Sequence, residues 1–269
     1  MSFSLGALGV ALVAALAAAL VLVAFTALWS RAAGRVSVVD TVWGLFFVAI
    51  GWTVAAVSGF GARSVLLAAL TTLWGLRLAW HIFMRARGHG EDFRYAAMLA
   101  SIPEDRRFGW AIRRVFLTQG VIAWFIALPL TVAAATDRPL GWVAWVGVAV
   151  WAIGLSFEAI GDAQLRAFKA DPAHKGKIMD RGLWAWTRHP NYFGDAALWW
   201  GLWLISAEAW PGVLTVLSPV AMTYFLAFRT GARLLEKEMA KRPGYPAYME
   251  RTSGFFPLPP KPSPRPTAQ

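Results

Sequence analysis

Apolar residues along this chain gather into long runs that are separated by short charged segments. A helix that crosses the roughly 30 Å hydrocarbon core of a bilayer needs about 20 mostly apolar residues. Seven runs approach this length, and the last two are the shortest. We therefore predict seven transmembrane helices, approximately at Leu5–Trp29, Val38–Val57, Val65–Met84, Val115–Ala135, Leu140–Ile160, Tyr192–Ala209 and Val213–Phe228.

The first run could be mistaken for a signal peptide. No Lys or Arg precedes it, and it is too long for the apolar part of such a peptide, so we expect it to be a retained span.

The basic residues lie almost entirely on one side of this arrangement. If the N-terminus is outside, Arg63 and Arg138 are the only basic residues on the outer side, and Arg77 lies within a span. The remaining 23 of the 26 Lys and Arg residues face inward, as the positive-inside rule requires. The pattern predicts an all-α polytopic membrane protein with its N-terminus outside and its C-terminus in the cytosol.

Composition narrows the class of protein. Of the 269 residues, 58% are hydrophobic and 15% are charged, which departs from the roughly 25% charged residues of soluble domains and argues against a soluble enzyme or a disordered chain. There is no cysteine, so disulfides and thiolate chemistry are excluded. The net charge of +11 belongs to the inner segments. It indicates topology and contact with anionic lipid, or a phosphate-bearing ligand, rather than nucleic acid.

No internal repeat is visible, and the spans leave no room for a second domain. We expect one integral-membrane domain over residues 1–257 and a Pro-rich disordered tail at 258–269. The Ala-, Val- and Arg-rich composition favours a bacterial inner membrane, with the endoplasmic reticulum as the alternative. The oligomeric state is not readable from the sequence.

Ionisable residues within spans are costly and tend to mark function. Asp40 begins the second span, and Arg77 and His81 share one face of the third span at i, i+4, with Trp74 one turn earlier. One interpretation is a structural ion pair of Arg77 with Asp40 or Glu158; the other is a polar cavity in the inner half of the bundle. The four histidines lack paired-ligand spacing, so we expect no metal site.

The most informative segment is residues 180–203, which carries Thr187-Arg188-His189-Pro190 before an apolar helix. A helix N-terminus at the membrane surface offers amide donors to phosphate, and Arg188 adds a forked cation. Asn191 and Asp195 are spaced i, i+4 and are expected to project together into the bundle, with Trp199 one turn later.

The run Thr-Arg-His-Pro-Asn-Tyr-Phe-Gly-Asp (187–195) resembles the signature of the membrane superfamily that joins steroid 5α-reductases, sterol C14/C7 reductases and isoprenylcysteine carboxyl methyltransferases. The segments 228–233 and 245–257 resemble the C-terminal block of steroid 5α-reductases, and 162–184 resembles their cytosolic cofactor loop. The resemblance is specific over about 160–257 and weak over the first half. It implies seven spans and a cytosolic C-terminus, in a bacterial branch of the superfamily.

The resemblance also implies an NADPH pocket that opens to the inner side, next to an apolar substrate that enters from the bilayer. The expected cofactor-binding residues are Arg77, Asp162, Arg166, Lys169, Lys177, Arg188, His189, Asn191, Tyr192, Asp195, Trp199, Arg229 and Arg233.

This chain departs from the reductases at the catalytic pair. The reductases use a Tyr hydroxyl and a Glu; here Trp74 stands at the Tyr position, and the Glu position falls on Asp40. An indole N–H is a very poor proton donor, so Asp40 is the ready acid, and His81 is a second possible donor. The predicted catalytic residues are therefore Asp40, Trp74 and His81.

The expected function is NADPH-dependent reduction of a carbon–carbon double bond in a sterol-like or other unsaturated lipid. One alternative is an S-adenosylmethionine-dependent methyltransferase of the same superfamily, whose Arg followed by paired Glu residues is approximated by Arg233, Glu236 and Glu238. The other is a non-catalytic lipid-binding membrane protein.

Overall fold

The computed structural model describes residues 3–229 and 231–261, and their regular secondary structure is entirely helical. The predicted all-α class is therefore confirmed. Internal contacts divide the chain into two compact units. Unit 1 comprises Met1–Ala144 with Trp203–Ser218, and unit 2 comprises Trp145–Leu202 with Pro219–Gln269.

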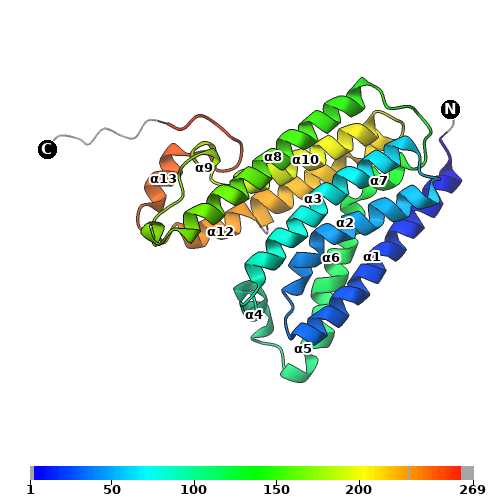
Figure 1. Cartoon of the computed structure of the whole chain (residues 1–269). Helices are drawn as coiled ribbons and strands as arrows, with labels where there is room; N and C mark the ends of the chain where they lie inside the picture. Colours follow the sequence, from blue (N-terminus) through cyan, green and yellow to red (C-terminus); the bar gives the residue numbers. More distant parts are fainter. Residues whose placement is uncertain (1–2, 230, 262–269) are drawn as a thin grey trace. The chain divides into compact units, whose positions relative to one another are not determined.

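Unit 1 is built around three long helices, and α2 lies between α1 and α3 (Figure 1). Its helices are α1 (Leu5–Ala33), α2 (Val38–Val57), α3 (Ala62–Ala86), α4 (Phe93–Leu99), α5 (Glu104–Ala111), α6 (Leu117–Ile126) and α7 (Leu128–Ala133), with a π-helical turn at Ile112–Phe116 and a 3₁₀ turn at Gly212–Val216.

The helices of unit 1 approach one another through small residues. Ala11, Ala15 and Ala19 recur at i, i+4 along α1 and are fully buried. Between α2 and α3 the approach is closer still, because a Cβ atom at Gly44 would lie 2.5 Å from the carbonyl oxygen of Gly75. Glycine is therefore required where these two backbones cross.

The N-terminus of α2 is capped from a distant loop rather than by its own Ser37. The carboxylate of Glu91 accepts hydrogen bonds from the backbone amides of Val36 (2.5 Å) and Ser37 (2.9 Å). A carboxylate at this position satisfies orphan amides and complements the helix dipole. The loop that follows α3 is thereby tied to the start of α2.

The predicted span Val115–Ala135 is divided in the structure. Helix α6 ends at Ile126, and α7 starts again with Pro129 in its first turn, because proline has no amide hydrogen to continue a helical ladder. The hydroxyl of Ser218 donates a hydrogen bond to the carbonyl of Ile126 and so satisfies a backbone group at the break.

A buried ion pair joins the start of α3 to the residues after α10. Arg63, only 3% exposed, binds the carboxylate of Glu208 at 2.9 Å and also donates to the carbonyl of Pro139 at 3.0 Å. Glu208 in turn accepts from the amides of Gly141 and Ala144, near the start of α8. These amide donors and the guanidinium of Arg63 together satisfy the buried Glu208 carboxylate.

Unit 2 contains most of α8 (Trp142–Ala170) and α10 (Pro190–Ala207), which pack closely through glycines. A Cβ atom at Gly154 would lie 2.6 Å from the carbonyl oxygen of Gly194. Its other helices are α9 (Leu183–Trp186), α11 (Leu217–Tyr224), α12 (Ala232–Met239) and α13 (Tyr245–Arg251), with a 3₁₀ turn at Pro172–His174 and a π-helical turn at Phe225–Arg229.

Hydrogen bonds tie the short α9 to the rest of unit 2. The Trp184 indole donates to the carbonyl of Gly161 at 3.0 Å, and the Tyr248 hydroxyl donates to the carbonyl of Trp184 at 2.5 Å. The amide of Leu258 donates to the carbonyl of Trp186, so the first residues of the predicted tail are hydrogen-bonded to this unit. Residues 262–269 of that tail lie outside the described residues.

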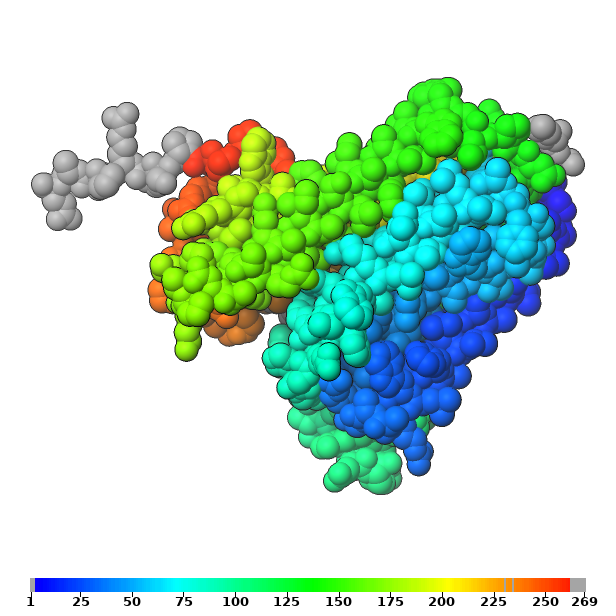
Figure 2. Space-filling model, in the orientation of Figure 1, coloured from blue at the N-terminus to red at the C-terminus, as the bar shows by residue number. Residues whose placement is uncertain are grey.

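Within the described residues, five helices are long and apolar enough to cross a membrane: Leu5–Ala33, Val38–Val57, Ala62–Ala86, Trp142–Ala170 and Gly212–Arg229. They indicate an integral membrane protein. The apolar side chains of α1 support this, since Val13, Val21 and Leu28 are 65% exposed or more; Figure 2 shows α1, in blue, at the surface of unit 1. The count of seven spans stays a prediction.

Candidate functional site

Asp40, in the first turn of α2, is the centre of a polar cluster in unit 1. Its carboxylate accepts a hydrogen bond from the Tyr95 hydroxyl at 2.6 Å and forms an ion pair with Arg94, also at 2.6 Å. The side-chain amide of Gln119, on α6, donates to the Tyr95 hydroxyl at 3.4 Å. A carboxylate and a phenol from distant parts of the sequence therefore share one short hydrogen bond.

The local sequence explains how this hydroxyl reaches Asp40. Asp92 caps α4, because its side chain accepts from the Arg94 amide at 2.9 Å, and the helix that follows carries Tyr95 in a buried position. Asp92 also forms an ion pair with the Arg94 guanidinium at 2.9 Å. The loop thus orients Arg94 and Tyr95 toward the same carboxylate.

Burial and neighbouring charges shift the pKa values of two members of this cluster, Tyr95 and Arg94. Burial raises the pKa of Tyr95 above its ordinary value, and the charge and hydrogen bond of Asp40 raise it further. Burial would lower the pKa of Arg94, but the hydrogen bond to Asp92 and the charge of Asp40 outweigh it and raise the value. Tyr95 is therefore a neutral hydroxyl that donates, beside a guanidinium that stays charged.

Asp40 has an ion-pair partner that the sequence did not indicate, Arg94; a pair of Arg77 with Asp40 or Glu158 stays a prediction. The sequence identified neither Arg94 nor Tyr95 as a candidate, because a charge-rich segment gives no sign of a distant partner. The other predicted catalytic residues lie on α3: Trp74 is fully buried with its ring 5.5 Å from that of Phe47, and His81 is half-buried.

Unit 2 holds a second cluster, centred on Glu236 of α12. Its carboxylate accepts from Arg188 at 2.6 Å and lies 3.3 Å from the His189 imidazole. Arg188 also donates to the carbonyls of Met249 (3.1 Å) and Thr252 (2.5 Å). Arg188, which we expected to bind a phosphate, here joins the segment 187–195 to α12 and α13.

The Glu236 carboxylate is strongly stabilised in its charged form. Burial alone would raise its pKa, but the hydrogen bonds and charges of His189 and Arg188 lower the value to about 2. Burial and the negative charge of Glu236 raise the pKa of nearby Tyr245 to about 12. The sequence approach connected Glu236 only to the methyltransferase alternative and did not predict these contacts.

Several predicted cofactor residues of unit 2 do meet. The Asn191 amide donates to the Asp162 carboxylate at 3.2 Å, which links the start of α10 to the end of α8. Tyr192 stacks on His189 with ring centroids 5.6 Å apart. Asp195 and Trp199 follow on α10 and are buried, as the i, i+4 spacing predicted for Asp195.

Apart from Arg188, the predicted Arg and Lys residues of unit 2 are exposed. Asp162, Arg166 and Lys169 are spaced i, i+4, i+7 on α8, so they share one helix face. The remaining exposed cations of the predicted set are Lys177, Arg229 and Arg233. Among the residues that the structure describes, no group of three or more His, Asp or Glu side chains could hold a metal ion.

Comparison with known proteins assigns the chain to a family. Residues 12–252 match a family described as protein of unknown function (DUF1295), which is steroid 5α-reductase-like. An uncharacterised protein of Schizosaccharomyces pombe is 24% identical over 235 residues, covering 78% of this chain and 67% of the yeast protein. No solved structure matches the chain. Because the family match runs through both units and both polar clusters, the chain belongs to the DUF1295 family.

Proposed function

We propose that this protein is an integral-membrane NADPH-dependent reductase that saturates a carbon–carbon double bond in a sterol-like or other unsaturated lipid. The observation that carries the proposal is the Asn191–Asp162 hydrogen bond of 3.2 Å. It joins the two segments expected to bind the cofactor, and Arg166 and Lys169 follow Asp162 on the same face of α8.

The chemical types of these side chains suit the groups of NADPH. The dinucleotide carries a pyrophosphate and a 2′-phosphate, and exposed Arg and Lys side chains bind phosphates through charge-assisted hydrogen bonds. Arg166, Lys169 and Lys177 would hold phosphates, while Asn191 and Asp162 would bind polar groups of the nucleotide. When bound, NADPH would supply the hydride that one alkene carbon receives.

The second alkene carbon needs a proton, and Asp40 is the acid that the sequence predicts for this step. The Tyr95 hydroxyl keeps its proton at Oη, since burial and Asp40 raise its pKa. It donates that hydrogen to the Asp40 carboxylate at 2.6 Å, so Tyr95 orients Asp40 and does not itself donate to the substrate.

The proposal includes an arrangement in the membrane. We infer seven spans, with α6 and α7 together forming one of them, in a bacterial inner membrane with the N-terminus outside. The C-terminal segment and the cations of unit 2 would then face the cytosol, where NADPH is available.

A methyltransferase remains the second candidate because of one observation. Glu236 contacts both Arg188 and His189, so the two segments that resemble the methyltransferases meet in unit 2. S-adenosylmethionine has no phosphate, so Arg166, Lys169 and Lys177 would have no phosphate to bind in that case.

Thermal unfolding of the purified full chain in a neutral detergent separates these functions. We expect NADPH to raise the melting temperature more than NADH does, since ligands stabilise the state they bind. Replacing Arg166 and Lys177 together by Ala should weaken NADPH binding about tenfold or more, because two phosphate contacts are lost.

The matched control replaces Lys237 and Arg242 by Ala, which removes the same charge from exposed positions of unit 2 outside the predicted set. Stabilisation by S-adenosylmethionine and not by NADPH would establish the methyltransferase instead. If neither nucleotide changes the melting temperature, a non-catalytic lipid-binding protein is the remaining explanation.

A further inference from the structure

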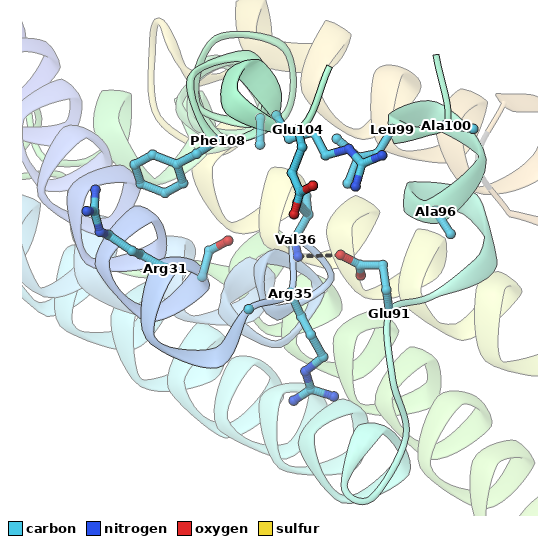
Figure 3. A pocket seen from close by; sticks show the side chains of 13 residues that line it. Arg31, Arg35, Val36, Glu91, Ala96, Leu99, Ala100, Glu104 and Phe108 are labelled. Atoms are coloured by element: carbon cyan, nitrogen blue, oxygen red, sulfur yellow. Dashed lines mark hydrogen bonds between the residues drawn. The ribbon is translucent and has the colours of Figure 1, made fainter. Parts of the chain in front are cut away.

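Unit 1 contains a cavity that the proposed reductase does not use. Its volume is about 620 Å³, which is in the range of small-molecule sites. It lies where the end of α1 meets α4 and α5, and Arg31, Glu91, Glu104 and Phe108 line it (Figure 3). Apolar side chains, among them Val36 and Leu99, complete the wall.

Three arginines line this cavity, and much of their hydrogen-bonding capacity is available. Arg31 lies over the Phe108 ring at 5.5 Å and forms no hydrogen bond with the described residues. Arg107 uses only its Nε, toward the carbonyl of Ile102. Arg35 uses one terminal nitrogen for the carbonyls of Ala86 and His89. Most of the guanidinium donors can therefore reach a ligand.

The two carboxylates of the cavity differ in their hydrogen-bond and ion-pair partners. Glu91 is occupied, because it accepts hydrogen bonds from the amides of Val36, Ser37 and Asp92. Glu104 forms no ion pair with the described residues, and its carboxylate points into the cavity (Figure 3). The cavity thus offers guanidinium donors for an anion and one carboxylate for a cation.

The surface of α1 below the cavity is apolar and exposed. Leu28, Ala24, Val21 and Ala17 precede Arg31 at i−3, i−7, i−10 and i−14, and all four are exposed. Residues at this spacing form one stripe along a helix. An acyl chain that lies along this stripe would carry its polar end to Arg31.

From these observations we propose that the cavity binds the headgroup of a membrane glycerophospholipid. The phosphate would bind Arg31 and Arg107, the glycerol region would contact Phe108 and Leu99, and the acyl chain would follow the stripe on α1. Glu104 favours a headgroup that also carries an ammonium group, such as ethanolamine. This site is independent of the reductase proposal.

Native mass spectrometry of the full chain in a maltoside detergent tests the proposal with three probes. Dioleoyl phosphatidylethanolamine has both parts, dioleoylglycerol lacks the phosphate, and glycerophosphoethanolamine lacks the acyl chains. We expect a saturable 1:1 complex with the phospholipid alone. Replacing Arg31 and Arg107 together by Ala should weaken that complex about tenfold or more, since two charge-assisted contacts disappear.

A matched pair of substitutions controls for general charge effects. Arg106→Ala with Arg114→Ala removes two exposed arginines of the same segment that do not line the cavity, and it should leave binding unchanged. Melting temperatures without lipid show whether each variant folds. Equal weakening by both pairs, or equal binding of dioleoylglycerol or of glycerophosphoethanolamine, would overturn the proposal.

Discussion

At the scale of single residues, carboxylates hold distant parts of the sequence together. Asp40 and Glu236 each bind two partners that come from elsewhere in the sequence. Removing one partner from a buried charge leaves it uncompensated, which costs more than the pair contributes. The same reasoning applies to Arg63 and Glu208, whose side chains are 2% and 5% exposed.

The pKa of Glu236 predicts how acid affects the fold. Its value falls from 4.5 to about 2 in the folded chain. A lowered carboxylate pKa stabilises the fold above the unfolded value, and this contribution is lost as the pH falls from about 4.5 to about 2. We therefore expect wild type to melt above Glu236→Gln at pH 7, and the difference to vanish by about pH 2. Melting curves of both proteins across this range measure it.

A difference between wild type and Glu236→Gln that persists unchanged at low pH would contradict this assignment. Glu238→Gln is the control, since Glu238 is 63% exposed and forms a surface ion pair with Lys241. Exposed pairs of this kind contribute little, so no comparable pH dependence is expected for that variant.

At the scale of elements, glycine allows two pairs of helices to pack with their backbones in close contact. In unit 1 the backbones of α2 and α3 cross at Gly44 and Gly75, and in unit 2 those of α8 and α10 cross at Gly154 and Gly194. Small residues allow apolar helices to gain van der Waals contact in a membrane, where water no longer drives their association. Side chains larger than hydrogen at these positions would separate the helices.

We expect Gly75→Ala to destabilise the protein by about 1–3 kcal/mol, the usual cost of overpacking. The added Cβ would lie 2.6 Å from the carbonyl oxygen of Gly44, and backbone cannot move aside as a flexible side chain can. Gly9→Ala on α1 is the matched control, because no atom lies within 4 Å of its new Cβ. Unfolding in one detergent compares them; equal stability of the two variants would contradict the close crossing.

At the scale of the whole molecule, the uneven distribution of basic residues predicts the orientation in the membrane. Five helices have the length and apolarity of a span, and the sequence predicts two more. Because the chain has no cysteine, a single introduced cysteine can report its own side of the membrane without background.

We expect Asp137→Cys to react with a membrane-impermeant maleimide in intact cells, and Lys175→Cys to react only after the membrane is opened. Both positions are exposed, and the predicted topology places them on opposite sides. Labelling of Lys175→Cys in intact cells would reverse the orientation. Equal access of both positions from one side would show an even number of crossings between them.

The sequence by itself determined the helical class and five of the long apolar helices. These properties depend on the length and periodicity of apolar runs, which are local. The bounds of α2 are the same as those predicted, Val38–Val57. The periodicity did not predict that the helix over 115–135 is interrupted, because the interruption depends on a single residue, Pro129.

Only the tertiary structure decided which polar groups meet. Arg94 and Tyr95 were not among the predicted site residues, and Arg188 was expected to bind a phosphate. The structure shows that they bind Asp40 and Glu236, from which 54, 55 and 48 positions separate them. A charged side chain looks the same in the sequence whether it faces water or a distant carboxylate. Helix packing and the path of the loops decide whether such a side chain meets a partner. A buried charge is stable only where the fold brings it that partner.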